Sequence, residues 1–279
     1  VVQADGRPTS VRGHLTASPM IAAQRRALIL EHLRKAGGDS IIDLAASIGV
    51  SSSTIRRDLD FLMQGGYIVR SHGGATINEP LFTTFERQRD IGAHVAHSAK
   101  AAIGARAADM LSHGQSVIFD SSSTVNEVAK IAVQRQVRLT ACTNDIATAA
   151  ILAESESIQL LVLGGTKRAG SLTLTGDPGA TFLGHLHADI AFIGIHSLFG
   201  GRLSETSLEV VGIKRRMIAS AAHPVVLADS SKFQHPAFCD VAEAAAVRTI
   251  ITDTGISGDD EQRLDDAGVH VIKVEPLAS

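Results

Sequence analysis

Short apolar runs rich in β-forming residues recur through the later part of the chain, and helix-compatible segments separate several of them. The runs occupy residues 116–119, 137–142, 158–163, 190–195, 225–227, 249–251 and 269–274. The helix-compatible segments include residues 125–134, 145–153 and 208–221. Strands that alternate with helices are typical of a parallel sheet covered by helices on both faces. This part of the chain is therefore predicted to form a Rossmann-like α/β domain.

Polar residues follow five of the predicted strands. They occupy residues 120–124, 143–145, 164–168, 196–197 and 229–232. In open α/β sheets, ligands bind in the crevice beyond the carboxyl ends of the strands. One polar loop carries little information, but five at equivalent places predict a binding crevice at that edge of the sheet.

The serine-rich loop 120–124 suits an anion, because it lies between a predicted strand and a predicted helix. Its backbone N–H groups and hydroxyls can surround a phosphate at the helix N-terminus. A helix cap without a ligand explains one such loop equally well. Asp120 and Glu209 suit sugar hydroxyls or an amine rather than a phosphate. Three cationic residues can complete the site: Arg168, Lys214 and Lys232. A phosphorylated sugar offers a phosphate to the loop and the cationic residues, and hydroxyl groups to Asp120 and Glu209.

Residues 20–77 follow a different pattern, in which three short helices precede a hairpin. Ser40 and Ser51 are candidate helix caps, and Gly49 suits the turn between the second and third helices. Residues 67–77 are predicted to form a strand, a glycine turn and a second strand. This order predicts a winged helix-turn-helix.

The third helix has two different faces. Ile55, Leu59 and Leu62 form an apolar stripe at helical spacing. The opposite face carries Ser53 and paired arginines, which alone more often mark a solvated surface. The hairpin that follows favours DNA recognition, since arginine reaches phosphates and guanine edges. The residues expected to contact DNA are Ser51, Ser52, Ser53, Thr54, Arg56, Arg57, Arg70 and His72.

Composition limits the remaining possibilities. The 279-residue chain has a net charge of -3, so DNA contact must come from a local patch. Cys142 and Cys239 are too few for a disulfide framework and lack metal-ligand spacing. His94 and His97 indicate a helical solvent face rather than a metal pair, so no metal or cofactor is expected. No apolar run suits a membrane span, and a soluble cytoplasmic protein is expected.

These patterns divide the chain into four parts. We expect a disordered tail at residues 1–19 and a winged helix-turn-helix at residues 20–77. A linker is expected at residues 78–95, and an effector-binding α/β domain at residues 96–279.

The quoted motifs resemble a known family over nearly the whole chain from about residue 21. Thr54-Ile55-Arg56-Arg57-Asp58-Leu59 and His72-Gly73-Gly74-Ala75 together resemble the DNA-binding domain of DeoR-family bacterial transcriptional regulators. Loop 120–124 and several later segments resemble the sensor domain of that family, which is similar in fold to ribose-5-phosphate isomerase. The resemblance implies that loop 120–124 grips the phosphate of an effector. The expected effector-binding residues are Asp120, Ser121, Ser122, Ser123, Thr124, Asn144, Gly165, Arg168, Glu209, Lys214 and Lys232.

One departure from the family pattern argues against enzymatic activity. After Gly194 the chain continues with Ile195-His196-Ser197, whereas the family often has Ala-Asp-Gly, and the isomerases use acidic residues nearby. We therefore predict a regulator that is not an enzyme: a repressor of a sugar or carbohydrate catabolic operon, controlled by a phosphorylated sugar. It is expected to bind double-stranded operator DNA as a homo-oligomer, a dimer or tetramer.

Two alternatives stay open from the sequence. The first is a sugar-phosphate isomerase or deaminase with an appended DNA-binding domain, in which Glu209 and Lys214 are catalytic. The second is an architectural DNA-binding protein that needs no ligand.

Overall fold

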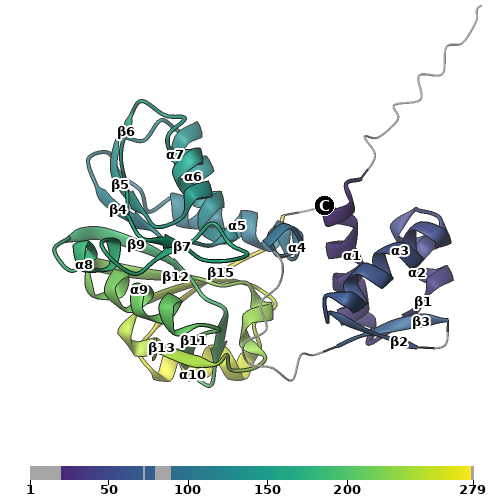
Figure 1. Ribbon diagram of the computed structural model, residues 1–279. Coiled ribbons are helices and arrows are strands. Elements are labelled where there is room, and N and C mark those ends of the chain that lie inside the picture. The colour runs from purple at the N-terminus through teal and green to yellow at the C-terminus, as the bar shows by residue number, and fades with distance from the viewer. Residues whose placement is uncertain (1–19, 72, 79–88, 278–279) are drawn as a thin grey trace, which may run out of the picture.

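The computed structural model describes residues 20–71, 73–78 and 89–277, which form an N-terminal and a C-terminal domain (Figure 1). The expected tail at residues 1–19, His72 of the expected wing, and residues 79–88 of the expected linker lie outside the described residues.

The described residues up to Asn78 form three helices and a three-stranded sheet in the order β1-β3-β2. The elements are α1 (Ala22–Ala36), β1 (Asp39–Ser40), α2 (Ile41–Ile48), α3 (Ser52–Gln64), β2 (Ile68–Ser71) and β3 (Gly74–Ile77). This arrangement confirms the predicted winged helix-turn-helix. The short strand β1 was not predicted. It pairs with β3 because Gly74 has no side chain, and a Cβ atom there would lie 2.1 Å from the carbonyl oxygen of Asp39.

Local signals explain where these helices begin. The hydroxyl of Ser40 accepts a hydrogen bond from the backbone N–H of Asp43 at 3.1 Å. The hydroxyl of Ser51 accepts one from Thr54 at 3.2 Å. Each bond satisfies one of the backbone donors that a helix N-terminus leaves unpaired. Gly49 makes the turn between α2 and α3 at a φ of 75°, which glycine adopts without steric cost.

Helix α4 (Arg89–His94) follows the wing and packs on α1. Ile91 and Val95 are buried in the same apolar cluster as Leu33 and Ile55. Part of the segment 78–95, which the sequence analysis assigned to a linker, therefore contributes to the N-terminal core.

The junction between the domains is short. The backbone N–H of Ala96 donates a hydrogen bond to the carboxylate of Glu31 on α1. Ala96 has a φ of 53°, and helix α5 (His97–Ala108) of the C-terminal domain begins at the next residue. The start of the C-terminal domain is thus tied directly to α1.

The C-terminal domain contains a seven-stranded parallel sheet in the order β15-β14-β12-β9-β4-β5-β6. Its strands are β4 (Ser116–Phe119), β5 (Leu139–Thr143), β6 (Ile158–Val162), β9 (Ala188–Gly194), β12 (Ala221–Leu227), β14 (Thr249–Asp253) and β15 (His270–Val274). All seven predicted apolar runs contribute a strand, and the parallel sheet confirms the α/β prediction. The strand order reverses between β4 and β9, so ligands are expected at the carboxyl ends of these two strands.

Helices cover both faces of this sheet (Figure 1). One face packs against α5, α6 (Ser123–Gln134) and α7 (Ile146–Leu152). The other packs against α8 (Gly179–Leu183), α9 (Leu208–Ala219) and α10 (Gly258–Asp266). Along β9, Ile190 and Phe192 join the first core while Ala191 and Ile193 join the second, as the alternation of a strand requires.

Several short elements complete the domain. The strands β10 (Ser197–Phe199), β11 (Arg202–Glu205) and β13 (Cys239–Glu243) form a small antiparallel sheet. The strands β7 (Thr166–Lys167) and β8 (Leu174–Thr175) form a hairpin after β6. Two 3₁₀ turns, η1 (Ser230–Phe233) and η2 (Ala244–Ala246), flank β13. Among the described residues, no helix is both long enough and apolar enough to cross a membrane.

Candidate DNA-binding surface and ligand cavity

Helix α3 separates its buried and exposed faces as the sequence predicts. Ile55 and Leu59 are fully buried, whereas Ser53, Arg56 and Arg57 are exposed. The remaining hydroxyl residues gather at the start of the same helix. The Ser51 hydroxyl lies 2.9 Å from those of both Ser53 and Thr54, and Ser52 is the first residue of α3. These groups therefore form one continuous polar surface.

A buried carboxylate holds α3 against α1. Asp58, on the inner side of α3, accepts hydrogen bonds from the Nε atoms of Arg25 at 2.5 Å and Arg26 at 2.9 Å. The guanidinium of Arg26 also lies 3.6 Å from the ring centre of Phe61. No local sequence signal predicts these contacts, because the paired residues lie 33 and 32 positions apart.

Arg70, which was expected to contact DNA near the tip of the wing, lies on strand β2. Its guanidinium donates to the carboxylate of Asp60 on α3 and to the carbonyl oxygen of Arg56 at 3.2 Å. The side chain therefore connects the wing to α3. His72, the other predicted wing contact, lies outside the described residues.

A cavity of about 830 Å³ opens beyond the carboxyl ends of β4 and β9, where the strand order reverses. Residues 121–124 after β4 and 194–197 after β9 line it, together with residues 168–173 after β6. The structure brings together seven of the predicted effector-binding residues on its walls: Ser121, Ser122, Ser123, Thr124, Arg168, Lys214 and Lys232. The crevice predicted from the polar strand ends is thus present.

The loop before α6 is held in place by its own hydroxyls. The Ser122 hydroxyl caps α6 by accepting a hydrogen bond from the N–H of Thr124 at 3.2 Å. The Ser121 hydroxyl donates to Asp145 at 3.0 Å and lies 2.5 Å from the hydroxyl of Thr173. Gly194 leaves room for this loop, since a Cβ atom there would lie 2.3 Å from the Cβ of Ser122.

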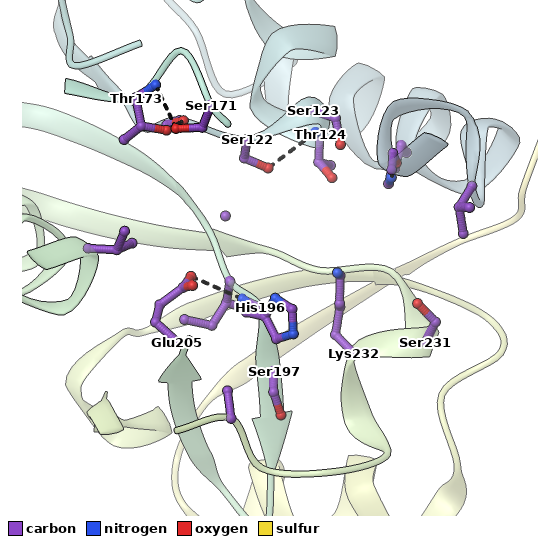
Figure 2. A pocket seen from close by; sticks show the side chains of 18 of the residues that line it. Ser122, Ser123, Thr124, Ser171, Thr173, His196, Ser197, Glu205, Ser231 and Lys232 are labelled. Atoms are coloured by element: carbon purple, nitrogen blue, oxygen red, sulfur yellow. Dashed lines mark hydrogen bonds between the residues drawn. The ribbon is translucent and has the colours of Figure 1, made fainter. Parts of the chain in front are cut away.

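Figure 2 shows the opposite wall of the cavity, which carries Glu205, His196, Ser197, Ser231 and Lys232. The Lys232 side chain extends from η1 toward the start of α6. An ammonium group and a helix N-terminus on facing walls can attract the same anion.

A buried ionic cluster lies at the edge of the cavity, where Lys214 and Glu205 are among the lining residues. The ammonium of Lys214 on α9 donates to the carboxylate of Asp120 and to the carbonyl oxygen of Gly194 at 2.7 Å. It also lies 3.3 Å from the carboxylate of Glu205. Burial raises the pKa of Asp120 and of Glu205, and the nearby ammonium opposes that rise. Burial alone would lower the pKa of Lys214, but the two carboxylates outweigh it and raise that pKa.

This cluster changes the roles expected for two residues. Asp120 and Lys214 were expected to offer separate charges to a ligand, but they neutralise one another. Asp120 does not line the cavity. The sequence has no carboxylate directly after Gly194, yet Glu205 on β11 supplies one at this place and accepts the N–H of His196 at 3.1 Å. No local pattern in the sequence marks Glu205.

Three other predicted ligand residues lie outside the cavity lining. Asn144 is buried and donates to the carbonyl oxygen of Leu174 at 3.1 Å. Gly165 supports the β7–β8 hairpin, where a Cβ atom would lie 2.5 Å from the carbonyl oxygen of Thr175. Glu209 is exposed at the start of α9. His94 and His97 have ring centres 6.5 Å apart, and no group of metal-ligand side chains forms in the described part of the chain.

Family models match both domains. Residues 25–80 match a model described as a DeoR-like helix-turn-helix domain. Residues 95–254 match a model described as the DeoR C terminal sensor domain.

Similar proteins of known sequence match along most of their length. A putative aga operon transcriptional repressor from Escherichia coli O157:H7 is 32% identical over 253 residues, covering 90% of this chain and 94% of that protein. The HTH-type transcriptional regulator GlpR from Haloferax volcanii is 32% identical over 256 residues, covering 91% and 98%. The HTH-type transcriptional repressor GlcR from Bacillus subtilis is 30% identical over 237 residues, covering 84% and 89%.

Among solved structures, ribose 5-phosphate isomerase A from Methanocaldococcus jannaschii is similar, with a TM-score of 0.36 and 16% identity. The match covers 48% of this chain and 53% of that one, about half of each.

Proposed function

Because this chain belongs to the DeoR family of DNA-binding transcriptional regulators, we propose that a phosphorylated sugar binds in the cavity of its C-terminal domain and controls its affinity for operator DNA. The chain is a regulator and not an enzyme. The regulated genes are proposed to form a sugar or carbohydrate catabolic operon, with this protein as the repressor.

The observation that carries the proposal is the position of Lys232, which faces the N-terminus of α6 across the cavity. Ser122, Ser123 and Thr124 surround that helix end with hydroxyls and backbone N–H groups. A phosphate placed there gains from the helix dipole, from hydrogen bonds and from the lysine charge. Arg168 lines the same cavity and adds a further positive charge.

The other polar groups suit the sugar part of such a ligand. Ser171 and Thr173 lie beside the α6 loop, and Ser197 lies on the facing wall (Figure 2). Hydroxyl groups can donate and accept, as the hydroxyls of a sugar require. Asp145 also faces the cavity, but it caps α7 by accepting the N–H groups of Ala147 and Thr148.

The DNA-reading surface is proposed to be the exposed side of α3 and its N-terminal hydroxyls. Arg56 and Arg57 provide the cationic contacts there. Two copies of such a domain are needed to read paired half-sites, so the active form is proposed to be a homo-oligomer. We also propose residues 20–77 as the DNA-binding domain and residues 96–279 as the effector-binding domain, with a linking segment between them.

A thermal-shift screen of phosphorylated sugars tests the proposal, with the same sugars without phosphate as matched controls. A phosphorylated sugar should raise the melting temperature of the full chain, whereas its unphosphorylated form should not. The same compound should change operator affinity by about 5–150-fold, the usual range of coupling between two sites.

Ser123→Asp is the decisive variant. Ser123 is the first residue of α6, so an aspartate there suits the helix dipole but repels a phosphate. The variant should fold and bind operator DNA but lose the response to phosphorylated sugars. An undiminished response would place the phosphate elsewhere.

A further inference from the structure

The cavity is not enclosed by the C-terminal domain alone. Leu30, Glu31 and Arg34 of α1 line it, and Tyr67 and Asn78 extend the same wall. Helix α4 lies between α1 and α5 (Figure 1) and brings this wall against the C-terminal domain. The proposed ligand site is therefore bounded on one side by the DNA-binding domain.

Arg34 is the charged group on this wall that lacks a partner. It lies in the last turn of α1, is partly buried, and forms no ion pair or hydrogen bond with any residue that the structure describes. Arginine is rarely deprotonated in proteins, so this side chain presents a permanent charge and several donors to the cavity.

The three carboxylates that line the cavity contact other groups rather than Arg34. Glu31 accepts the N–H of Ala96. Asp145 caps α7, and Glu205 lies against Lys214 in the buried cluster. Arg34 is therefore available to pair with an anionic group of a ligand.

Lys100 adds a second cation. It is only 6% exposed, lines the cavity, and donates from its ammonium to the carbonyl oxygen of Gly92 in α4 at 2.5 Å. Cations of both domains therefore line the cavity: Arg34 on α1 of the N-terminal domain, and Lys100 and Lys232 in the C-terminal domain. The volume of about 830 Å³ is near the upper end of the range for small-molecule sites, which leaves room for a ligand that reaches both.

We propose that the effector is a sugar with two anionic groups, one held at the start of α6 and the second held by Arg34 of the DNA-binding domain. This inference rests on the proposed function and specifies its ligand class. The effector then bridges the two domains and fixes their relative position.

Helix α1 provides the path from this contact to the DNA surface. Arg34 lies near one end of α1, and Arg25 and Arg26 near the other hold Asp58 of α3. The two ends are roughly 14 Å apart along the helix axis. A displacement of Arg34 by the effector therefore moves a rigid helix that is ion-paired to the DNA-reading helix.

The test compares fructose 1,6-bisphosphate with fructose 6-phosphate by calorimetric titration of the full chain. Wild-type protein should bind the bisphosphate at least about tenfold more tightly, since a charge-assisted hydrogen bond contributes that much. Arg34→Gln should abolish this preference and leave the binding of the monophosphate unchanged. The matched control is Lys35→Gln, which removes an exposed charge from the next position of α1, outside the cavity lining, and should keep the preference.

The outcomes separate this inference from the proposed function. If Arg34→Gln and Lys35→Gln both keep the wild-type preference, or if wild-type protein shows none, the bridging role of Arg34 is overturned. If Ser123→Asp leaves the binding of both sugars unchanged, the proposed phosphate site itself is wrong. Operator affinity without sugar, measured for both α1 variants, shows that the DNA-binding domain is folded in each.

Discussion

Removal of the Lys214 ammonium should destabilise the C-terminal domain strongly at neutral pH. In Lys214→Met, the buried carboxylates of Asp120 and Glu205 lose the cation that the structure places between them. Both carboxylates are at least nine-tenths buried, so water does not replace the lost interaction. The methionine occupies a similar volume, and the variant therefore tests the charge rather than the packing.

The expected magnitude follows from the burial of the whole cluster. Removing one partner of a buried ion pair costs about 3–5 kcal/mol, because the remaining charge stays uncompensated. For a domain of this size, that loss corresponds to a fall in melting temperature of roughly 6–20 °C. The exposed pair of Lys130 with Glu127, at 2.7 Å, is the matched control, and Lys130→Met should cost under about 1 kcal/mol.

The stability that Lys214→Met loses should depend on pH in a defined direction. Burial raises the pKa of Asp120 and Glu205, and without Lys214 only backbone hydrogen bonds from Ser121, Gly194 and His196 oppose that rise. A carboxyl group whose pKa is higher in the folded state destabilises the protein above that pKa and ceases to do so as the pH falls. Lys214→Met should therefore lose less stability at pH 5.5 than at pH 7.5.

Urea unfolding of the full chain, followed at both pH values, measures these losses. Adding Asp120→Asn to Lys214→Met should recover part of the stability, because it removes one of the unpaired charges. If Lys214→Met lowers the free energy of unfolding by less than about 1 kcal/mol at pH 7.5, or by the same amount at both pH values, the buried carboxylates do not depend on the charge of Lys214.

Three further predictions concern other parts of the chain. Arg56→Ala or Arg57→Ala should weaken operator binding and reduce the slope of log binding constant against log salt concentration by about one. The C-terminal domain should melt as in the wild type. Unchanged operator affinity in both variants would contradict the assigned DNA surface. Asp58→Asn should destabilise the N-terminal domain by about 2–3 kcal/mol in urea unfolding, because two arginines of α1 lose their carboxylate, and a negligible loss would exclude that contact. Burial raises the pKa of the Cys142 thiol to about 12, so a thiol reagent at pH 8 should modify Cys239 alone in folded protein and both thiols after denaturation.

Periodic and local signals determined much of this protein from the sequence alone. The stripe of Ile55, Leu59 and Leu62 predicted the buried side of α3, and Ser40 and Ser51 marked the helix starts. These signals are reliable because the contacts they report lie within a few residues along the chain. The polar strand ends likewise predicted a crevice, since parallel strands bring all their carboxyl ends to one edge.

Only the tertiary structure decided which charged groups meet. Lys214 lies 94 positions from Asp120, and their contact depends on β9 lying beside β4 rather than at the sheet edge. Parallel strands joined by crossovers can be ordered in many ways, and an apolar run contains no information about its neighbour. The position of Arg34 in the cavity depends further on how α4 places the N-terminal domain against the C-terminal one. The sequence thus determined the elements and the edge at which a ligand binds, while the strand order and the domain contact selected the charges that face it.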